Sequence, residues 1–64
     1  MKMTRGWKIY VDPRKKNVHI GRIGRMNTLK ILFPFPMEYE IFNEDRLNQF
    51  LNGYKRKSYF IIWH

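Results

Sequence analysis

The chain has 64 residues, no cysteine and a formal net charge of +8. A chain this short forms one domain with a small core, and the lack of cysteine excludes disulfides and thiolate zinc sites. Its apolar runs are far shorter than the ~20 residues of a membrane-spanning helix, and Lys8 and Asp12 interrupt any signal-peptide core. We therefore expect a cytoplasmic protein. It should form a single domain over 1–64, with 1–5 as the part that frays.

The first predicted element is a β-hairpin with a basic tip. Residues 7–11 and 18–20 alternate between apolar and other side chains, which is typical of strands. Between them, Asp12 and Pro13 favour the start of a type I turn, and Asn17 tolerates a positive φ at its exit. In the following IGRIGR segment, the glycines indicate a bulge or the close approach of another backbone.

Residues 28–33 predict a third strand, since Leu29, Ile31 and Phe33 alternate with other residues. Pro34 and Pro36 remove backbone donors, so this strand ends there or lies at a sheet edge. The segment MEYEI that follows, within 36–42, is either a short fourth strand or an extended connector.

A helix is predicted near 44–52. Asn43 is a good N-cap, Glu44 and Asp45 place negative charge at the positive end of the helix dipole, and Gly53 supplies a C-terminal stop. The end of the chain, YFIIW, is apolar on both faces, which favours a central strand.

Together these elements predict an α+β fold. It contains a small, mostly antiparallel sheet of three to five strands with one helix packed on one face, in the order ββ(β)βαβ. If the helix covers one face, the open face presents Lys8, Tyr10, His19, Lys30, Lys57 and Tyr59.

Catalysis and metal binding find little support in the sequence. His19 and His64 are the only histidines, and two histidines with a nearby lysine can cleave RNA, but their spacing does not indicate a pair. No zinc or calcium ligand spacing and no phosphate-binding glycine loop is present. We therefore expect a protein that is not an enzyme and that needs no cofactor or metal.

Nucleic-acid binding is the function that the composition favours. The net charge is +8 over residues 1–31, −3 over 32–54 and +3 over 55–64, and such basic segments attract polyanions. Tyrosines lie between the basic residues, and rings that stack on bases beside charges that hold phosphates are typical of single-strand binding. The candidate binding residues are Lys8, Tyr10, Arg14, Lys15, Lys16, His19, Arg22, Arg25, Lys30, Lys55, Arg56, Lys57 and Tyr59.

RNA is favoured over duplex DNA, because the predicted helix begins with acidic residues and does not suit a major groove. A β-ribbon that binds DNA is an alternative. An unpaired sheet edge can also join two copies, so a homodimer is a further alternative.

The other function class is a protein-binding inhibitor that acts without nucleic acid. The segment 33–45 combines acids with aromatic residues and can dock on a basic host enzyme, although its rings can equally pack under the helix. The candidate docking residues are Glu38, Tyr39, Glu40, Glu44 and Asp45.

In its profile alone, the chain resembles small phage-encoded inhibitors of host or defence proteins. The shared features are short length, no cysteine, basic charge and many aromatic residues, and no motif matches. Some of these inhibitors bind RNA and use it to block a toxin ribonuclease. The resemblance implies an RNA-dependent, antitoxin-like inhibitor of a toxin or nuclease in the host cytoplasm.

Overall fold

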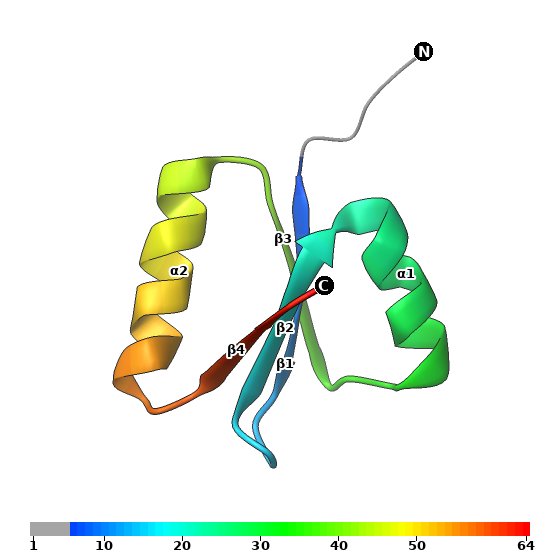
Figure 1. The fold of residues 1–64 in the computed structure, drawn as a ribbon, viewed down its shortest axis with the longest axis horizontal. Helices are drawn as coiled ribbons and strands as arrows, with labels where there is room; N and C mark the ends of the chain where they lie inside the picture. Colours follow the sequence, from blue (N-terminus) through cyan, green and yellow to red (C-terminus); the bar gives the residue numbers. More distant parts are fainter. Residues whose placement is uncertain (1–5) are drawn as a thin grey trace.

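The computed structural model describes residues 6–64, so the expectation for 1–5 lies outside the described residues. The elements follow one another as ββαβαβ (Figure 1). They are β1 (Trp7–Asp12), β2 (Asn17–Arg22), α1 (Ile23–Leu32), β3 (Met37–Ile41), α2 (Glu44–Arg56) and β4 (Phe60–Trp63). Neither helix of this described part is long and apolar enough to cross a membrane.

The strands form one four-stranded sheet in the order β3-β1-β2-β4. β1 lies at the centre and pairs antiparallel with both β2 and β3, whereas β4 pairs parallel with β2. The predicted α+β class and mostly antiparallel sheet are confirmed, and MEYEI is a strand rather than a connector.

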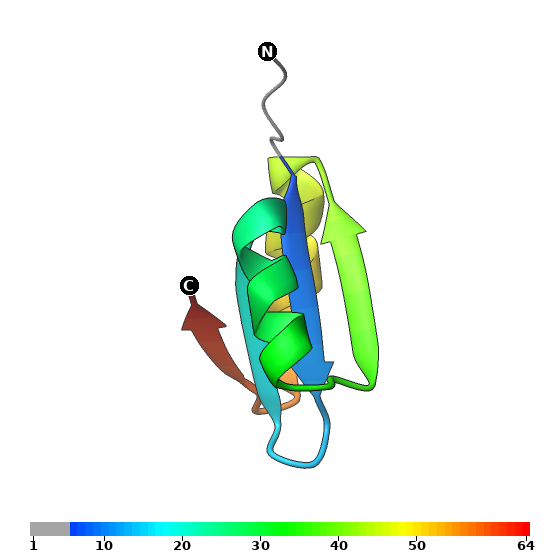
Figure 2. The same ribbon diagram turned by 90° about the vertical axis from the view of Figure 1, so that its right-hand side faces the viewer.

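One helix covers each face of the sheet, so the prediction of a single helix is wrong (Figures 1 and 2). The chain crosses β1 from β2 to β3 through α1, and then returns across the whole sheet from β3 to β4 through α2. Two crossovers of the same hand that run in opposite directions place their helices on opposite faces. No face of β1 and β2 is therefore left open as a platform.

The segment predicted as a third strand belongs to α1. Leu29, Ile31 and Phe33 alternate over too few residues to distinguish a strand from a helix. With the period of a helix, the same segment places Met26 and Leu29 on one face. This face packs on the sheet, and Ile31 points into solvent. α1 ends at Leu32, because Pro34 disfavours helical backbone at the residue before it.

Gly21 allows α1 to approach the sheet closely. A Cβ at Gly21 would lie 2.9 Å from Met26 Sδ and 3.2 Å from the backbone oxygen of His64. The β1–β2 register continues through Gly21 up to the Trp7–Arg22 pair. Of the two predicted reasons for this glycine, the close approach is confirmed, and the ladder has no bulge there.

α2 begins as predicted and ends later. The Asn43 side chain accepts a hydrogen bond from the backbone N–H of Arg46 at 3.1 Å, and acidic residues occupy the first turn. The helix runs through Gly53 to Arg56, beyond the predicted end at 52. Its last turn is held by Tyr54, whose ring lies 5.0 Å from Phe50 and 4.9 Å from Tyr59, centroid to centroid.

The main core lies between the sheet and α2. Four residues of β1 and β2 and two of α2 are buried there, namely Ile9, Val11, Val18, Ile20, Leu47 and Leu51. β4 contributes to this core through Ile61, but it is an edge strand and not the central strand that was predicted. Two of its apolar residues, one on each face, are accordingly uncovered: Phe60 is 70% exposed and Trp63 is 59% exposed.

Candidate nucleic-acid interface

The tip of the β1–β2 hairpin carries three consecutive exposed cations, Arg14, Lys15 and Lys16. Asp12 Oδ1 accepts hydrogen bonds from the backbone N–H groups of Arg14 at 3.1 Å and of Lys15 at 3.4 Å, which fixes the turn. Lys16 has the positive φ, 55°, which was predicted for Asn17. The three side chains therefore extend from a well-defined backbone.

The end of α2 lies beside this tip. The backbone N–H of Phe60 donates to the carbonyl oxygen of Lys16 at 2.8 Å, which joins the turn after α2 to the hairpin. Figures 1 and 2 both show the hairpin tip and this turn at the same end of the molecule. We call the six cations gathered here the basic end: Arg14, Lys15, Lys16, Lys55, Arg56 and Lys57.

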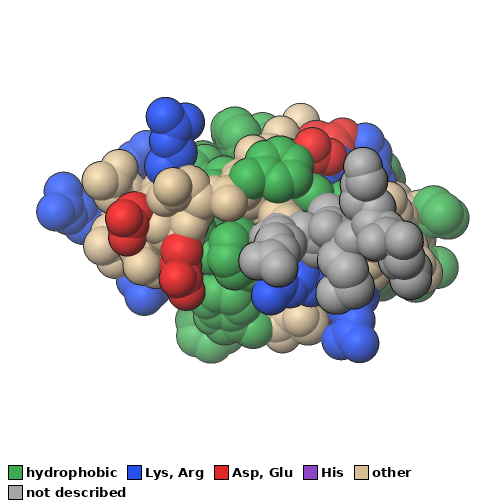
Figure 3. All heavy atoms as spheres, turned by 90° about the horizontal axis from the view of Figure 1, so that it is seen from above, with side chains coloured by type: hydrophobic (Ala, Val, Ile, Leu, Met, Phe, Trp, Pro, Cys, Tyr) green, Lys and Arg blue, Asp and Glu red, His purple; other side chains and the backbone are tan. Residues whose placement is uncertain are grey.

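None of the ion pairs found within residues 6–64 involves the basic end. The opposite end, seen in Figure 3, shows acidic, basic and hydrophobic side chains mixed together. Six positive charges are thus gathered where β1, β2, α2 and β4 meet, beside the single acid Asp12, and an excess of this kind attracts polyanions.

Two other predicted binding residues are neutralised by acids on the α1 side of the sheet. Lys8 Nζ lies 2.9 Å from Glu40 Oε2 and 3.1 Å from Glu38 Oε1, and Lys30 Nζ pairs with Glu38. The hydrogen bond to Glu40 raises the pKa of Lys8, and the hydrogen bonds from Lys30 and then Lys8 lower the pKa of Glu38. These groups hold α1, β1 and β3 together and offer little net charge to a ligand.

The predicted open face does not exist. Tyr10 is 0% exposed, and its ring stacks on Phe35 with centroids 5.1 Å apart and planes at 6°. Tyr59 lies on the other side of the sheet, where it packs on Tyr54. Since α1 is a helix over this face, Tyr10 is a core residue rather than a platform for a base.

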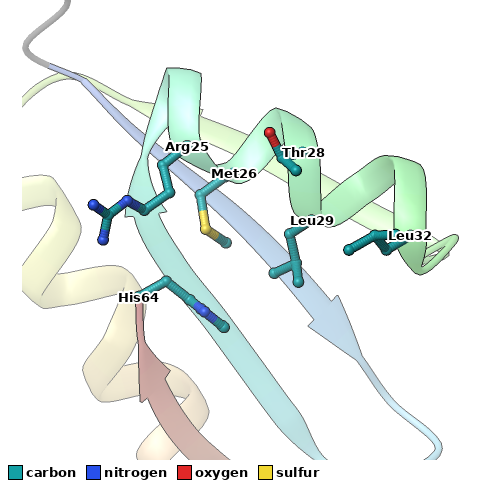
Figure 4. Close-up of a pocket in the computed structure, with 6 residues that line it drawn as sticks. All are labelled: Arg25, Met26, Thr28, Leu29, Leu32 and His64. Carbon is teal, nitrogen blue, oxygen red and sulfur yellow. The ribbon is translucent and has the colours of Figure 1, made fainter.

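The remaining predicted cations lie away from the basic end. The Arg22 guanidinium carbon lies 4.9 Å from the centroid of the Trp7 ring, on the strand pair that these residues share. Arg25 extends from the first turn of α1 alongside His64 (Figure 4).

The acidic docking residues do not form one surface. Glu38 and Glu40 lie on the α1 side and pair with lysines, whereas the Tyr39 ring faces α2 and lies 5.0 Å from Phe50. Glu44 and Asp45 are exposed in the first turn of α2. The expectation that rings of this segment pack under the helix is confirmed for Tyr39.

The two histidines, far apart in sequence, are in contact. His19 Nδ1 lies 2.9 Å from His64 Nε2, and the ring centroids are 5.1 Å apart. The backbone N–H of His64 donates to Ile20 at 2.8 Å and so extends the parallel ladder that places His64 near His19. Burial, and then the neighbouring His64, lower the pKa of His19.

This pair lies in a groove between α1 and the edge of the sheet. Two adjoining hollows of about 450 and about 400 Å³ share Leu29 and His64, and we call them together the histidine groove. Arg25 lies at one end and Lys15 at the other, while His19 lines the hollow nearer Lys15. Residues 6–64 contain no group of three histidine, cysteine or acidic side chains that could hold a metal ion.

The sequence interpretation missed two exposed rings and one histidine contact. Phe60 is bonded to Lys16 through its backbone, and Phe33, which is 55% exposed, lines the histidine groove together with Lys15. Had the sequence interpretation placed the last strand at a sheet edge, the alternation of side chains would have predicted Phe60 to be exposed on the same face as His64. The sequence offers no comparable signal for Phe33, because its exposure depends on the helix that precedes it.

No protein-family model matches the chain, and no curated protein or solved structure shows detectable similarity to it.

Proposed function

We propose that this protein binds single-stranded RNA through the basic end, without catalysing a reaction on it. The observation that supports this most directly is the meeting of six exposed cations from two distant segments at one end of the molecule, away from the ion-paired acids. Cations that have no acidic partner can neutralise phosphates and release the counterions condensed on the nucleic acid, which is the main source of sequence-independent affinity.

Exposed rings beside the basic end favour a single strand. Phe60 and Phe33 are both more than half exposed, at 70% and 55%, and both lie next to lysines of the hairpin tip. Unstacked bases can stack on such rings, whereas the bases of a duplex are already stacked. α2 begins with Glu44 and Asp45, which does not suit entry into a major groove.

The contact between the histidines supports a binding protein over a ribonuclease. An acid and a base that cleave a phosphodiester must reach the attacking and the leaving oxygen. With 2.9 Å between His19 Nδ1 and His64 Nε2, the two rings bond to each other and leave no room for a phosphate between these atoms.

Charge reversal at the tip tests the proposal. We expect the double variant Arg14→Glu/Lys16→Glu to bind a labelled single-stranded RNA much more weakly, and each lost phosphate contact to reduce the salt dependence of log Kd by about one. Its thermal midpoint should change little, because surface substitutions usually alter stability by less than about 0.5 kcal/mol. Fluorescence anisotropy over a range of KCl concentrations provides the measurement.

Arg14→Glu and Arg46→Glu form a matched pair for this test. Both replace one exposed arginine and change the net charge equally, but Arg46 lies in the first turn of α2, at the other end of that helix. Arg14→Glu should weaken binding and Arg46→Glu should have little effect. Equal effects would mean that only total charge matters, and unchanged binding in both would remove the basic end from the interface.

Inhibition of a toxin or nuclease stays a prediction from the sequence profile. If it is correct, the tip variants should lose inhibition together with RNA binding.

A further inference from the structure

The histidine groove begins within the basic end. Lys15 is exposed at the hairpin tip and also lines the hollow that contains His19 and His64. The neighbouring hollow continues along α1 to Arg25, and Figure 4 shows Met26 and Leu29 pointing from α1 toward the sheet beside it. A strand held at the tip can therefore continue into this groove.

The histidine pair is fixed from several sides. The His19 ring lies 5.0 Å from the Phe35 ring, which itself stacks on buried Tyr10. His64 is fixed through its backbone N–H, which donates to Ile20 at 2.8 Å. Because the two ring nitrogens are 2.9 Å apart, one ring donates a proton to the other.

The lining of the groove suits a nucleotide. Phe33 offers a ring face for a base, and Lys15, Arg25 and the histidines offer N–H donors for phosphate. Asp12 is the acid in the lining, and its Oδ1 already accepts two backbone hydrogen bonds within the tip. An acidic peptide would satisfy the same cations but would leave the ring face without a planar partner.

We propose that the histidine groove binds a nucleotide of the bound single strand, with its phosphate beside the His19–His64 pair, and that this pair takes up one proton from solvent on binding. The proposal rests on the proposed function, since it concerns the path of the same strand.

The direction of the pH dependence follows from the charges in the groove. In the free protein, burial and then His64 lower the pKa of His19, Asp12 opposes this shift and Lys15 adds to it. Arg25 also lines the groove, in the hollow that it shares with His64. A phosphate beside the pair stabilises the form with one added proton and so opposes the lowering of the His19 pKa. Affinity therefore rises as pH falls, by at most about tenfold per pH unit for one proton.

The test compares the chain with His19→Gln and His64→Gln. Binding of a labelled oligouridylate is measured from pH 8 to pH 5.5 at constant ionic strength, and calorimetry in buffers of different ionisation enthalpy counts the protons taken up. We expect tighter binding at low pH and uptake of close to one proton for the unaltered chain. Both variants should lose this pH dependence and the proton uptake, while the salt dependence that the basic end supplies remains.

Phe33→Ala probes the ring independently of pH, with Ile31→Ala as its control. Phe33→Ala should weaken binding at every pH by between about fivefold and about a hundredfold, the range for loss of one stacked base. Ile31 is 82% exposed and lines neither hollow, so Ile31→Ala should bind normally. Circular dichroism confirms that each variant is folded, and a variant that fails to fold is replaced by His64→Asn or Phe33→Leu.

The outcomes separate the two proposals. Salt-dependent RNA binding without proton uptake, or with uptake that both histidine variants retain, overturns the role of the groove and leaves the basic end intact. Absence of RNA binding at every pH overturns the proposed function itself. Equal, pH-dependent binding of oligoglutamate would assign the groove to acidic peptides and would also overturn the nucleotide proposal.

Discussion

The hydroxyl group of Tyr10 is buried and has no hydrogen-bond partner among residues 6–64. Burial raises the pKa of this phenol, because the charged form would lose its hydration. A buried hydroxyl without a partner costs free energy relative to a ring that lacks it. Tyr10 therefore serves the fold through its ring, which packs between the sheet and Phe35.

We expect Tyr10→Phe to leave the free energy of unfolding unchanged or to raise it by up to about 1 kcal/mol. RNA affinity should also be unchanged, since the ring lies beneath α1. Urea denaturation and fluorescence anisotropy measure the two quantities. A loss of more than about 1 kcal/mol would show that the hydroxyl is hydrogen-bonded after all.

At the scale of elements, α1 is the part that depends most on the rest of the fold. It has ten residues, a glycine in its first turn and no side-chain cap at its start. Helices of this length are marginal in isolation, so packing of Met26 and Leu29 on the sheet must supply most of its stability. The face that carries Ile31 contributes little to this packing.

Two alanine substitutions distinguish this helix from the strand that the sequence predicts. Met26 is 0% exposed, and we expect Met26→Ala to lower the free energy of unfolding by about 2–4 kcal/mol. Ile31→Ala should cost less than about 0.5 kcal/mol, because Ile31 is already in solvent. In a strand, Ile31 would share a buried face with Leu29. A cost of Ile31→Ala similar to that of Met26→Ala would therefore contradict the helix.

Elements with strong local signals could be predicted from the sequence. The hairpin and the start of α2 depend on alternation, turn residues and an N-cap that act over a few residues, and all of these are present in the structure. The edge position of β4 and the helical state of 23–32 depend on contacts between distant segments. The contact between His19 and His64 depends on the parallel β2–β4 pairing, which no local pattern indicates.

At the scale of the whole molecule, the spatial charge pattern differs from the pattern along the chain. The first 31 residues hold the largest excess of basic residues, but Lys8 and Lys30 are paired with acids of β3. The basic end instead combines the hairpin tip with the last turn of α2. Opposite ends of α2 also carry opposite charges, which suits the helix dipole and separates the acids from the proposed interface.

If about four to six phosphates contact the basic end, log affinity for single-stranded RNA should fall with log salt with a slope of about −3 to −4. Unrelated sequences should bind similarly, because charges and rings do not distinguish bases strongly. Titrations at several KCl concentrations with two oligonucleotides of equal length measure both properties. A slope near zero, or a strong preference for one sequence, would contradict a mainly electrostatic interface.

The two edges of the described sheet differ in a way that limits self-association. β3 carries Glu38 and Glu40, and charged residues on an edge strand discourage pairing with another chain. β4, Phe60–Trp63, has no charged residue and no proline, so it is the unprotected edge. Two copies joined through β4 would leave a protected β3 edge on either side, and such a sheet could not grow further into a fibre.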